Sequence, residues 1–432
     1  MMDKAIKKRI EQIARGEAPE GYEKTAFGIF PCDWGKHKIA EIFEIYSGGT
    51  PDTTQVKYWD GDIPWCVSTD ITGCGKYIAH TARNITQLGL SNSAAILIPS
   101  GSILMCSRAT IGPRCINIIP MATNQGFKNL VCKENNSIEF FYYYLDILLK
   151  QFLKNSSGST FLELAKGVLS QQLCVIPNEK EQEKIAEILQ TQDRLIELKE
   201  KLIAEKYKQK QYLMYVLLTG KVRLPGFSDD WERVELKKVS TMCSGGTPST
   251  ENEEYYGGEY IWVSIADMTA TAKYLTDSNK KLSELGLNNC SARLFPAGTV
   301  LFAMYASIGE CVIAGKECAT SQAILGITPD NEKLNNEFLY YALKQQQNKI
   351  VKMQQASSQP NLNKSLVESI IINAPSLKML QKGIKEQEEI VKVLSMADAE
   401  IDALKEELIL QRKQRDALMR LLLTGIVRVK YE

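Results

Sequence analysis

The sequence contains little histidine and no excess of charge of either sign. His37 and His80 are the only histidines among 432 residues, so a zinc site would have few ligands and histidine-based catalysis could not occur in both halves. The formal net charge is +1, and residues 25–178 hold 12 basic and 11 acidic side chains. Because DNA-binding domains are commonly basic, this composition alone neither favours nor excludes nucleic acid as a partner.

Long hydrophobic runs are also missing. No segment approaches the roughly 20 apolar residues that span a bilayer, and the charged opening MMDKAIKKRIEQIARGE lacks the apolar stretch of a signal peptide. We therefore expect a cytoplasmic protein that does not contact a membrane. The 11 cysteines include no C-x-x-C pair, so we interpret them as reduced side chains that pack as small hydrophobes, and we expect no metal site.

Motifs for nucleotide binding and methyl transfer are absent as well. No G-x-x-x-x-G-K-[ST] loop occurs, no G-x-G-x-x-G follows a candidate strand, and no Asn- or Asp-Pro-Pro-aromatic tetrapeptide of an amino-methyltransferase is present. Glu235-Leu236-Lys237 resembles a fragment of a nuclease site, but so short a pattern is common. A self-sufficient nuclease or methyltransferase would therefore need an unrecognised active site. An adaptor whose helices bind partners other than DNA is a third alternative.

The sequence repeats itself over nearly its whole length. The pentapeptide SGGTP at 47–51 returns at 244–248, and RNITQLGLSNSA (83–94), RATIG (108–112) and ATNQ (122–125) have counterparts at the same offset of 197. The offset becomes 198 beyond residue 139, and it is 205 for KEQEKIAEIL (180–189) and LLTGKVRL (217–224). These fixed offsets indicate a tandem duplication of a variable domain followed by a helical region.

Each helical region carries a heptad seam. Its positions alternate by four and three, which predicts two helices of about 40 residues, and Gly220 and Gly425 stand where a C-cap glycine belongs. Because an apolar seam needs cover, we expect the two helices to pack against each other, antiparallel. The expected packing residues are Ile185, Leu189, Ile196, Ile203, Leu213, Leu217, Ile390, Leu394, Ile401, Leu404, Leu408, Leu418 and Leu422.

Polar residues interrupt this seam. They are Gln192, Lys199, Lys206, Gln411 and Arg415. Two interpretations are open, either simple exposure near the helix ends or a face that is completed by the helices of a partner.

The variable domains have the pattern of mixed α/β structure. Short apolar runs at 63–68, 94–99 and 102–107, separated by Gly, Pro, Asn and Asp, predict strands, and residues 137–150 and 335–350 predict helices. The tyrosines at 142–144 could stack on bases or pack in a core, and their helical spacing favours the core. A duplicated domain carried by long helices is suited to reading two half-sites on a linear polymer. Because the domains differ while the helices match, the half-sites should differ in sequence.

The chain resembles the specificity subunit of type I restriction–modification systems. The resemblance rests on the EQ pair that opens each helix (Glu181-Gln182 and Glu386-Gln387), on the LLTG that closes it, and on the repeated SGGTP and IG loops. It implies an α+β fold in which two mixed α/β target-recognition domains are joined by two long helices. The helices form an antiparallel coiled coil, and the chain has an internal pseudo-twofold repeat. The implied segments are a helical lead-in (1–24), the first recognition domain (25–178), a central helical region (179–224), the second recognition domain (225–378) and a C-terminal helical region (379–432).

The resemblance also implies a division of labour. Such a subunit is not catalytic and binds no cofactor itself, and it recognises a bipartite, asymmetric sequence in double-stranded DNA with an unspecified gap. Two modification subunits bring S-adenosylmethionine and methylate adenine. Restriction subunits can join them, to translocate and cleave DNA with ATP and Mg²⁺.

Within this interpretation, side chains of the variable domains should contact DNA. Arg108 could bond a guanine edge, whereas the second domain has Tyr305 there; the alternative for Arg108 is a surface ion pair. Gln125 and Gln322 could pair with adenine or serve as turn residues. SGGTP is identical in both domains, so it should be a framework turn or a phosphate contact. The divergent stretches at 52–62 and 249–259 should help to distinguish the half-sites. The candidate DNA-binding residues, with the lysines assigned to phosphate, are Gly48, Gly49, Thr50, Lys76, Arg108, Thr110, Gln125, Lys128, Lys166, Gly245, Gly246, Thr247, Lys273, Tyr305, Ser307, Gln322 and Lys364.

Overall fold

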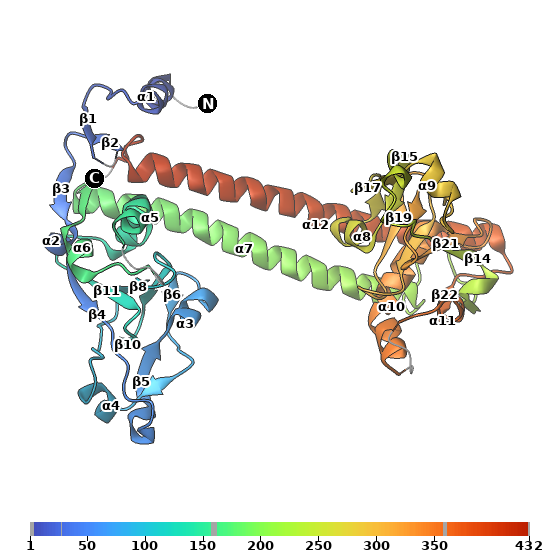
Figure 1. Cartoon of the computed structure of the whole chain (residues 1–432), viewed down its shortest axis with the longest axis horizontal. Helices are drawn as coiled ribbons and strands as arrows, with labels where there is room; N and C mark the ends of the chain where they lie inside the picture. Colours follow the sequence, from blue (N-terminus) through green and yellow to red (C-terminus); the bar gives the residue numbers. More distant parts are fainter. Residues whose placement is uncertain (1–3, 27, 157–161, 357–360, 431–432) are drawn as a thin grey trace. The chain divides into compact units, whose positions relative to one another are not determined.

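The chain forms two compact units, each with one variable domain and part of each long helix. In a computed structural model, which describes residues 4–26, 28–156, 162–356 and 361–430, the units are Met1–Leu198 with Leu408–Glu432, and Lys199–Glu407. The long helices are α7 (Glu179–Leu218) and α12 (Leu380–Leu423), as Figure 1 shows. Their lengths of 40 and 44 residues confirm the prediction from the heptad seam.

The first unit begins with the lead-in and holds the first variable domain. Its shorter helices are α1 (Lys4–Ala14), α2 (Ile39–Ile42), α3 (Ser68–Gly73), α4 (Gln87–Ser91), α5 (Ile138–Asn155), α6 (Lys166–Gln171) and the 3-10 helix η1 (Val56–Tyr58). Its strands are β1 (Tyr22–Thr25), β2 (Gly28–Pro31), β3 (Gly35–Lys38), β4 (Phe43–Ser47), β5 (Trp59–Cys66), β6 (Tyr77–Ile78), β7 (Asn84–Ile85), β8 (Ser102–Cys106), β9 (Arg114–Asn117), β10 (Ala122–Thr123), β11 (Phe127–Cys132) and β12 (Leu173–Ile176).

The second unit contains the second variable domain. Its shorter helices are α8 (Ile265–Ala270), α9 (Glu284–Asn288), α10 (Asn336–Ala356), α11 (Lys364–Glu368) and the 3-10 helices η2 (Leu236–Lys238) and η3 (Glu253–Tyr255). Its strands are β13 (Glu232–Glu235), β14 (Ser240–Ser244), β15 (Tyr256–Val263), β16 (Tyr274–Leu275), β17 (Lys280–Leu282), β18 (Val300–Ala303), β19 (Cys311–Ala314), β20 (Ala319–Thr320), β21 (Ile324–Pro329) and β22 (Ile371–Ala374).

The two variable domains have the same sheet topology. A five-stranded sheet is ordered β4-β11-β8-β9-β6 in the first domain and β14-β21-β18-β19-β16 in the second. A three-stranded sheet is ordered β10-β5-β7 and β20-β15-β17. The registers also correspond, since Lys128 pairs with Met105 and Leu325 pairs with Phe302, each at the predicted offset of 197. The internal repeat is therefore confirmed at the level of individual strand pairs.

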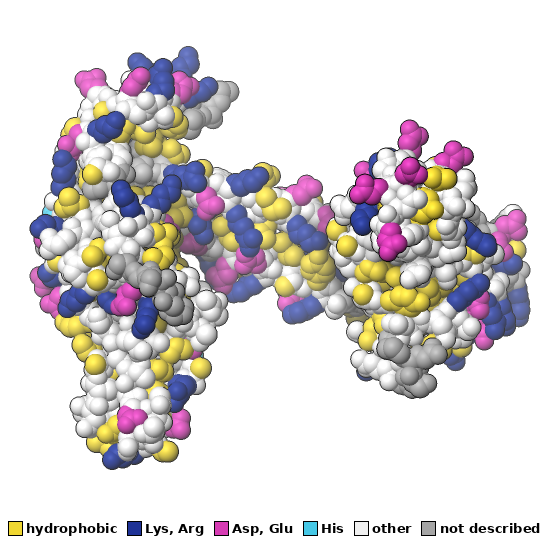
Figure 2. Space-filling model, viewed as in Figure 1, with side chains coloured by type: hydrophobic (Ala, Val, Ile, Leu, Met, Phe, Trp, Pro, Cys, Tyr) yellow, Lys and Arg dark blue, Asp and Glu magenta, His cyan; other side chains and the backbone are white. Residues whose placement is uncertain are grey.

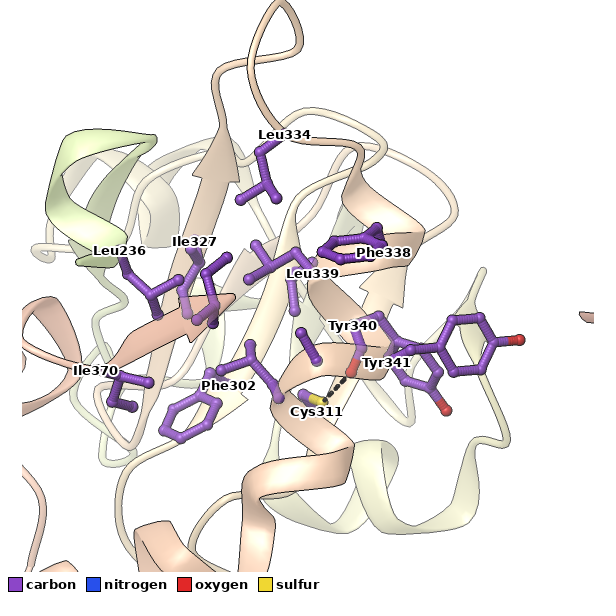
Figure 3. Close-up of a cluster of buried hydrophobic side chains, with 14 of the residues drawn as sticks. Leu236, Phe302, Cys311, Ile327, Leu334, Phe338, Leu339, Tyr340, Tyr341 and Ile370 are labelled. Atoms are coloured by element: carbon purple, nitrogen blue, oxygen red, sulfur yellow. Dashed lines mark hydrogen bonds between the residues drawn. The ribbon is translucent and has the colours of Figure 1, made fainter. Parts of the chain in front are cut away.

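An aromatic-rich helix packs on each five-stranded sheet. In the first unit α5 starts at the N-cap Ser137, whose hydroxyl accepts a hydrogen bond from the amide of Phe140 at 3.3 Å, and it buries an edge-to-face pair of Phe141 with Phe43. In the second unit, Phe338 and Leu339 of α10 lie in one buried cluster with side chains from the sheet (Figure 3). Burying each such side chain contributes about 1.5–3 kcal/mol, so these helices anchor the sheets.

The tyrosines at 142–144 belong to this core. Tyr143 and Tyr144 are fully buried, and Tyr142 is half-buried. The core interpretation is confirmed for the first two, because neither ring is open to a base. Two of the predicted strands, at 63–68 and 102–107, coincide largely with β5 and β8.

The strand prediction at 94–99 is wrong. Only Ile98 pairs there, in an isolated bridge with Met121. Ala95 and Ile98 are buried while Ile96 and Leu97 are exposed, which is not the alternation of a strand. The apolar run therefore belongs to an irregular segment in which Ala95 and Ile98 are buried.

Within each unit the long helices run antiparallel. Ion pairs join residues whose numbers rise along α7 as they fall along α12: Asp193 with Arg415 at 3.0 Å in the first unit, and in the second Lys199 with Glu407, Lys206 with Glu400 at 2.6 Å, and Lys210 with Asp398. Every expected packing residue on the seam is buried or half-buried. Simple exposure does not describe Lys199, Lys206 and Arg415, because these residues are half-buried and pair with acidic side chains of the opposite helix.

The end of each long helix docks on the start of the other. Arg428, which follows α12, makes two hydrogen bonds of 2.8 Å to the buried carboxylate of Glu181 at the start of α7. Arg223, which follows α7, holds Glu386 in the same way at 2.8 and 2.9 Å. Gly220 and Gly425 have φ of +69° and +67°, which confirms the predicted C-caps.

An ion pair between strand and helix has opposite polarity in the two domains. In the first, Arg114 at the start of β9 contacts Asp146 of α5 at 2.8 Å. In the second, Glu310 just before β19 contacts Lys344 of α10. Asp146 and Lys344 occupy the same position of the repeat. The contact between strand and helix is therefore kept in both domains, with the two charges exchanged.

Candidate nucleic-acid interface

The two SGGTP loops are enclosed by neighbouring backbone that leaves no room for a side chain. Gly48 and Gly49 are buried, and a Cβ added to Gly49 would lie 2.3 Å from the backbone nitrogen of Ala95. Gly245 and Gly246 are buried in the second domain, where a Cβ on Gly246 would lie 2.2 Å from a backbone nitrogen. Glycine is therefore required at these positions by the close approach of two chain segments.

The polar groups of these loops are used within the protein. Gly49 donates its N–H to the carbonyl of Thr123 at 2.9 Å, and its own carbonyl accepts the indole N–H of Trp65 at 2.9 Å. The same two bonds, at the same distances, recur through Gly246, Thr320 and Trp262. They join the end of the five-stranded sheet to the three-stranded sheet. These contacts favour the framework interpretation of SGGTP over a phosphate contact.

The residue after the glycines reaches the surface in both domains. Thr50 donates its hydroxyl to the side-chain carbonyl of Gln125, and both residues are exposed. Thr247 accepts a hydrogen bond from the backbone N–H of Gln322 at 3.5 Å, and both are exposed as well. The structure thus brings together candidates that lie 75 residues apart in sequence.

The loops that follow β8 and β18 expose four further candidates. Arg108, Thr110, Tyr305 and Ser307 are all exposed. The guanidinium of Arg108 lies 4.0 Å from the carboxylate of Glu163, so the alternative of a surface ion pair is realised. Such an exposed pair is worth at most about 1 kcal/mol, so a contact with a base can replace it at a small cost.

Lys76 and Lys273, which the sequence suggested for phosphate, are partly buried on the side of each variable domain that faces the long helices. Lys76 pairs with Glu139 and lies 4.3 Å from the ring centre of Tyr143. Lys273 pairs with Glu337 and donates to the hydroxyl of Tyr341 at 3.0 Å. Burial lowers the pKa of Lys76 below its ordinary value, and Glu139 offsets only part of this effect.

The same tyrosines extend these networks to the long helices. Tyr143 donates to Asp193 of α7 at 2.7 Å, and Tyr341 donates to Asp398 of α12 at 2.6 Å. Both lysines therefore help to hold a variable domain on its helix, and this shared structural role accounts for their recurrence in the two domains.

The remaining lysines differ in accessibility. Lys166 and Lys364 are exposed at the first positions of α6 and α11, where they can reach a phosphate. Lys128 is only 4% exposed, beneath the Arg108 loop, so it has little access to phosphate. On the face shown in Figure 2, basic and acidic side chains are interspersed. Positive charge that can reach a phosphate is offered by single exposed groups such as Arg108, Lys166 and Lys364.

Other kinds of site are not found in the described residues. None of the helices there has the length and apolar character that a membrane span requires. Likewise, residues 4–26, 28–156, 162–356 and 361–430 contain no group of three or more His, Cys, Asp or Glu side chains placed to hold a metal ion. All 11 cysteines are free thiols.

Comparison with known proteins assigns the chain to a family. Residues 31–205 and 228–411 each match the model of the type I restriction modification DNA specificity domain, and together they cover most of the sequence. The chain belongs to this specificity family. Two similar members from Methanocaldococcus jannaschii, the type I restriction enzyme MjaIX specificity subunit and the putative MjaX specificity subunit, are 28% and 26% identical over 95% of this chain and 97% of each relative.

Solved structures of specificity subunits share the fold. The S subunit from M. genitalium has a TM-score of 0.52 at 17% identity, over 90% of this chain and 96% of that one. A chain from a study of complex assembly and conformational transition in the type I R-M system has a TM-score of 0.62 at 16% identity, over 92% and 99%. At these identities the likeness concerns the fold alone, and it agrees with the two-domain architecture described above.

One exposed group of this specificity-family chain was missed by the sequence reasoning. The guanidinium of Arg83 lies 3.6 Å from the ring centre of Trp59. It also lies beside Trp65, whose indole bonds Gly49; we call this contact between the SGGTP loop and the three-stranded sheet the SGGTP joint. In the second domain Lys280 lies 5.8 Å from the ring of Tyr256. A signal was available, because cation and aromatic recur at the repeat offset of 197 in both domains.

Proposed function

We propose that this chain is the non-catalytic subunit that selects the DNA sequence on which a type I restriction–modification enzyme acts. The observation that carries the proposal is the pair of domains with one framework and different exposed loops. Arg108 faces solvent where the second domain presents Tyr305, while the SGGTP joint beneath them is the same. Each domain would read one half of a bipartite, asymmetric target in double-stranded DNA.

The catalytic steps would belong to other subunits. Two modification subunits would bind S-adenosylmethionine and methylate adenine, and restriction subunits would use ATP and Mg²⁺ for translocation and cleavage. The long helices offer a surface for such partners, because large hydrophobic side chains are exposed along them. In the first unit these are Leu195, Leu198, Ile409 and Leu410, and in the second unit Leu202, Tyr212 and Met396.

Exchanging the first variable domain tests the proposed division between half-sites. Residues 25–178 would be replaced by the corresponding domain of another specificity subunit, and methylated adenines would be mapped across a genome. We expect one half of the methylated motif to change and the other to stay the same. A change in both halves would contradict independent domains. Cleavage or methylation of plasmid DNA by the purified chain alone, given Mg²⁺ and S-adenosylmethionine, would contradict the non-catalytic role.

The proposed partner surface predicts a second result. Leu195 and Leu198 lie three residues apart on α7, 44% and 46% exposed, so L195E combined with L198E would place two carboxylates on that surface. We expect affinity for the modification subunit to fall at least about 10-fold, because desolvated apolar contacts dominate such interfaces. Affinity would be measured by calorimetry. The control is L285E, since Leu285 on α9 is equally exposed, at 48%. Equal affinity of the double variant and the control would refute this surface.

A further inference from the structure

Three side chains of the first variable domain form a chain of charges that runs from the interior to the surface. The amine of Lys128 lies 3.9 Å from one carboxylate oxygen of Glu163, and the guanidinium of Arg108 lies 4.0 Å from the other. Lys128 is buried on β11, whereas the side chains of Arg108 and Glu163 are 49% and 46% exposed. A single carboxylate is thus shared by a buried and an exposed cation, and it neutralises neither completely.

The backbone around this group is fixed. Ser107 donates to the carbonyl of Gly126 at 2.8 Å, Leu164 donates to Ser107 at 2.8 Å, and Ala109 donates to Leu162 at 2.9 Å. Arg108 and Glu163 face each other across an isolated antiparallel bridge. Backbone hydrogen bonds therefore fix the chain on both sides of Arg108, and the direction of the Arg108 side chain remains variable.

All three positions lose their charge together in the second domain. Leu325 occupies the place of Lys128, because both lie at the same register of equivalent strand pairs. Asn361 occupies the place of Glu163, because Leu362 donates to the carbonyl of Met304 at 3.0 Å just as Leu164 donates to Ser107. The group Arg108, Lys128 and Glu163 is therefore matched by Tyr305, Leu325 and Asn361.

Burial of Lys128 needs a reason. A buried ammonium is costly unless it is well paired, and the amine of Lys128 makes long contacts, 3.5 Å to the hydroxyl of Ser107 and 3.9 Å to the carboxylate of Glu163. Burial lowers the pKa of Lys128 below its ordinary value, although Glu163 opposes this. The second domain folds with leucine at this position, so the framework itself does not require a cation there.

We propose that these three positions form the base-reading site of each domain, and that Lys128 and Glu163 are positioning residues for Arg108. The inference rests on the proposed function and names a specificity determinant within it. Arg108 would bond the O6 and N7 atoms of a guanine, which requires a defined orientation of its planar group. The carboxylate of Glu163 supplies that orientation. Lys128 partly neutralises the negative charge of Glu163, so that Arg108 keeps a net attraction for the base. Tyr305 and Asn361 would read a different base.

Opposite effects are expected from the two positioning residues. Without Lys128, Glu163 would pair fully with Arg108, and DNA would have to break that pair. K128M should therefore lower both affinity and discrimination. Without the charge of Glu163, Arg108 would be free but no longer directed. E163Q should therefore raise the affinity for unrelated DNA while lowering discrimination, and its binding should depend more steeply on salt.

The test is selection from DNA with a randomised half-site, using the full-length chain and these variants. We expect the wild type to prefer guanine at one position of the first half-site, and R108A to lower that preference about 10- to 100-fold at that position alone. K128M and E163Q should weaken the same position. Combining R108Y, K128L and E163N should remove the guanine preference and leave the other positions intact. The matched control is L325M, which should not affect the first half-site.

The outcomes separate this inference from the function on which it rests. Absence of any sequence preference in the wild type would overturn the proposed function together with the inference. A specific wild type whose preference is unaltered by R108A would overturn the inference alone. A uniform loss of binding by K128M across all sequences, with earlier thermal unfolding, would show that Lys128 is only structural and would overturn its positioning role.

Discussion

Substituting Gly49 with alanine is expected to destabilise the first variable domain by about 3 kcal/mol or more, because the new methyl group would lie against backbone that cannot move aside. Its nearest neighbours would be the carbonyl carbon of Ala94 and the nitrogen of Ala95, both at 2.3 Å. These atoms belong to the segment that is pinned by the bridge between Ile98 and Met121. Relief would require separating the five-stranded from the three-stranded sheet, and with it the bond from Trp65 to Gly49.

Hydrogen exchange followed by mass spectrometry would measure this effect, since it reports on each domain separately in a protein that need not unfold in one step. Peptides from β5, β10 and β11 should lose protection in G49A, while those of the second domain should not. Gly73 provides the control, because a Cβ there meets nothing within 4 Å. G73A should change stability by no more than about 1 kcal/mol. Similar protection in G49A and G73A would refute the role of the joint.

Removing the Arg223 guanidinium is expected to be equally damaging to the second unit. R223M would leave the carboxylate of Glu386 buried, and among the described residues the indole N–H of Trp231, at 3.3 Å, would be its remaining side-chain hydrogen-bond partner. Uncompensated burial of one member of an ion pair typically costs about 3–5 kcal/mol. The start of α12 should then lose its hold on the segment that follows α7, which urea denaturation and exchange of peptides around 380–394 would reveal.

A second substitution distinguishes buried charge from lost packing. Adding E386Q to R223M removes the charge and should restore more than half of the lost stability, whereas a packing defect would persist. R194M is the matched control, since Arg194 and Glu197 form an exposed pair with 60% and 47% of their side chains accessible. Such pairs contribute about 0–1 kcal/mol. Equal losses in R223M and R194M would show that burial of Glu386 is unimportant.

The sequence predicted best those features that depend on periodicity. The heptad seam predicted both long helices, and Gly220 and Gly425 marked their ends, because helix geometry ties burial to spacing directly. The duplicated SGGTP also predicted a shared framework element, and in both domains its second glycine makes the same two hydrogen bonds to neighbouring strands. That motif is local in sequence, but its requirement for glycine comes from Ala95, which the sequence does not place beside it.

The sequence predicted less about charged side chains, because their role depends on what lies opposite. Lys76 and Lys128 are both single lysines with no charged neighbour within two positions in sequence, yet one holds a domain on its helix and the other lies beneath a surface loop. Arg83 could be recognised as part of a cation–aromatic pair only once the structure placed it on the ring of Trp59. The role of such residues is set by their tertiary neighbours, which here lie in other segments of the same domain.

The reversed ion pair between strand and helix has a consequence for how such genes can recombine. A crossover between the two repeats that fell inside a variable domain, after β9 and before α5, would join Arg114 to Lys344 in one product. The reciprocal product would join Glu310 to Asp146, so both would place like charges together in a partly buried contact. A crossover within the shared motifs of the long helices would keep each pair intact. Selection against the first class of hybrids would favour inheritance of each domain as a single block, so new specificities would arise by exchanging whole domains.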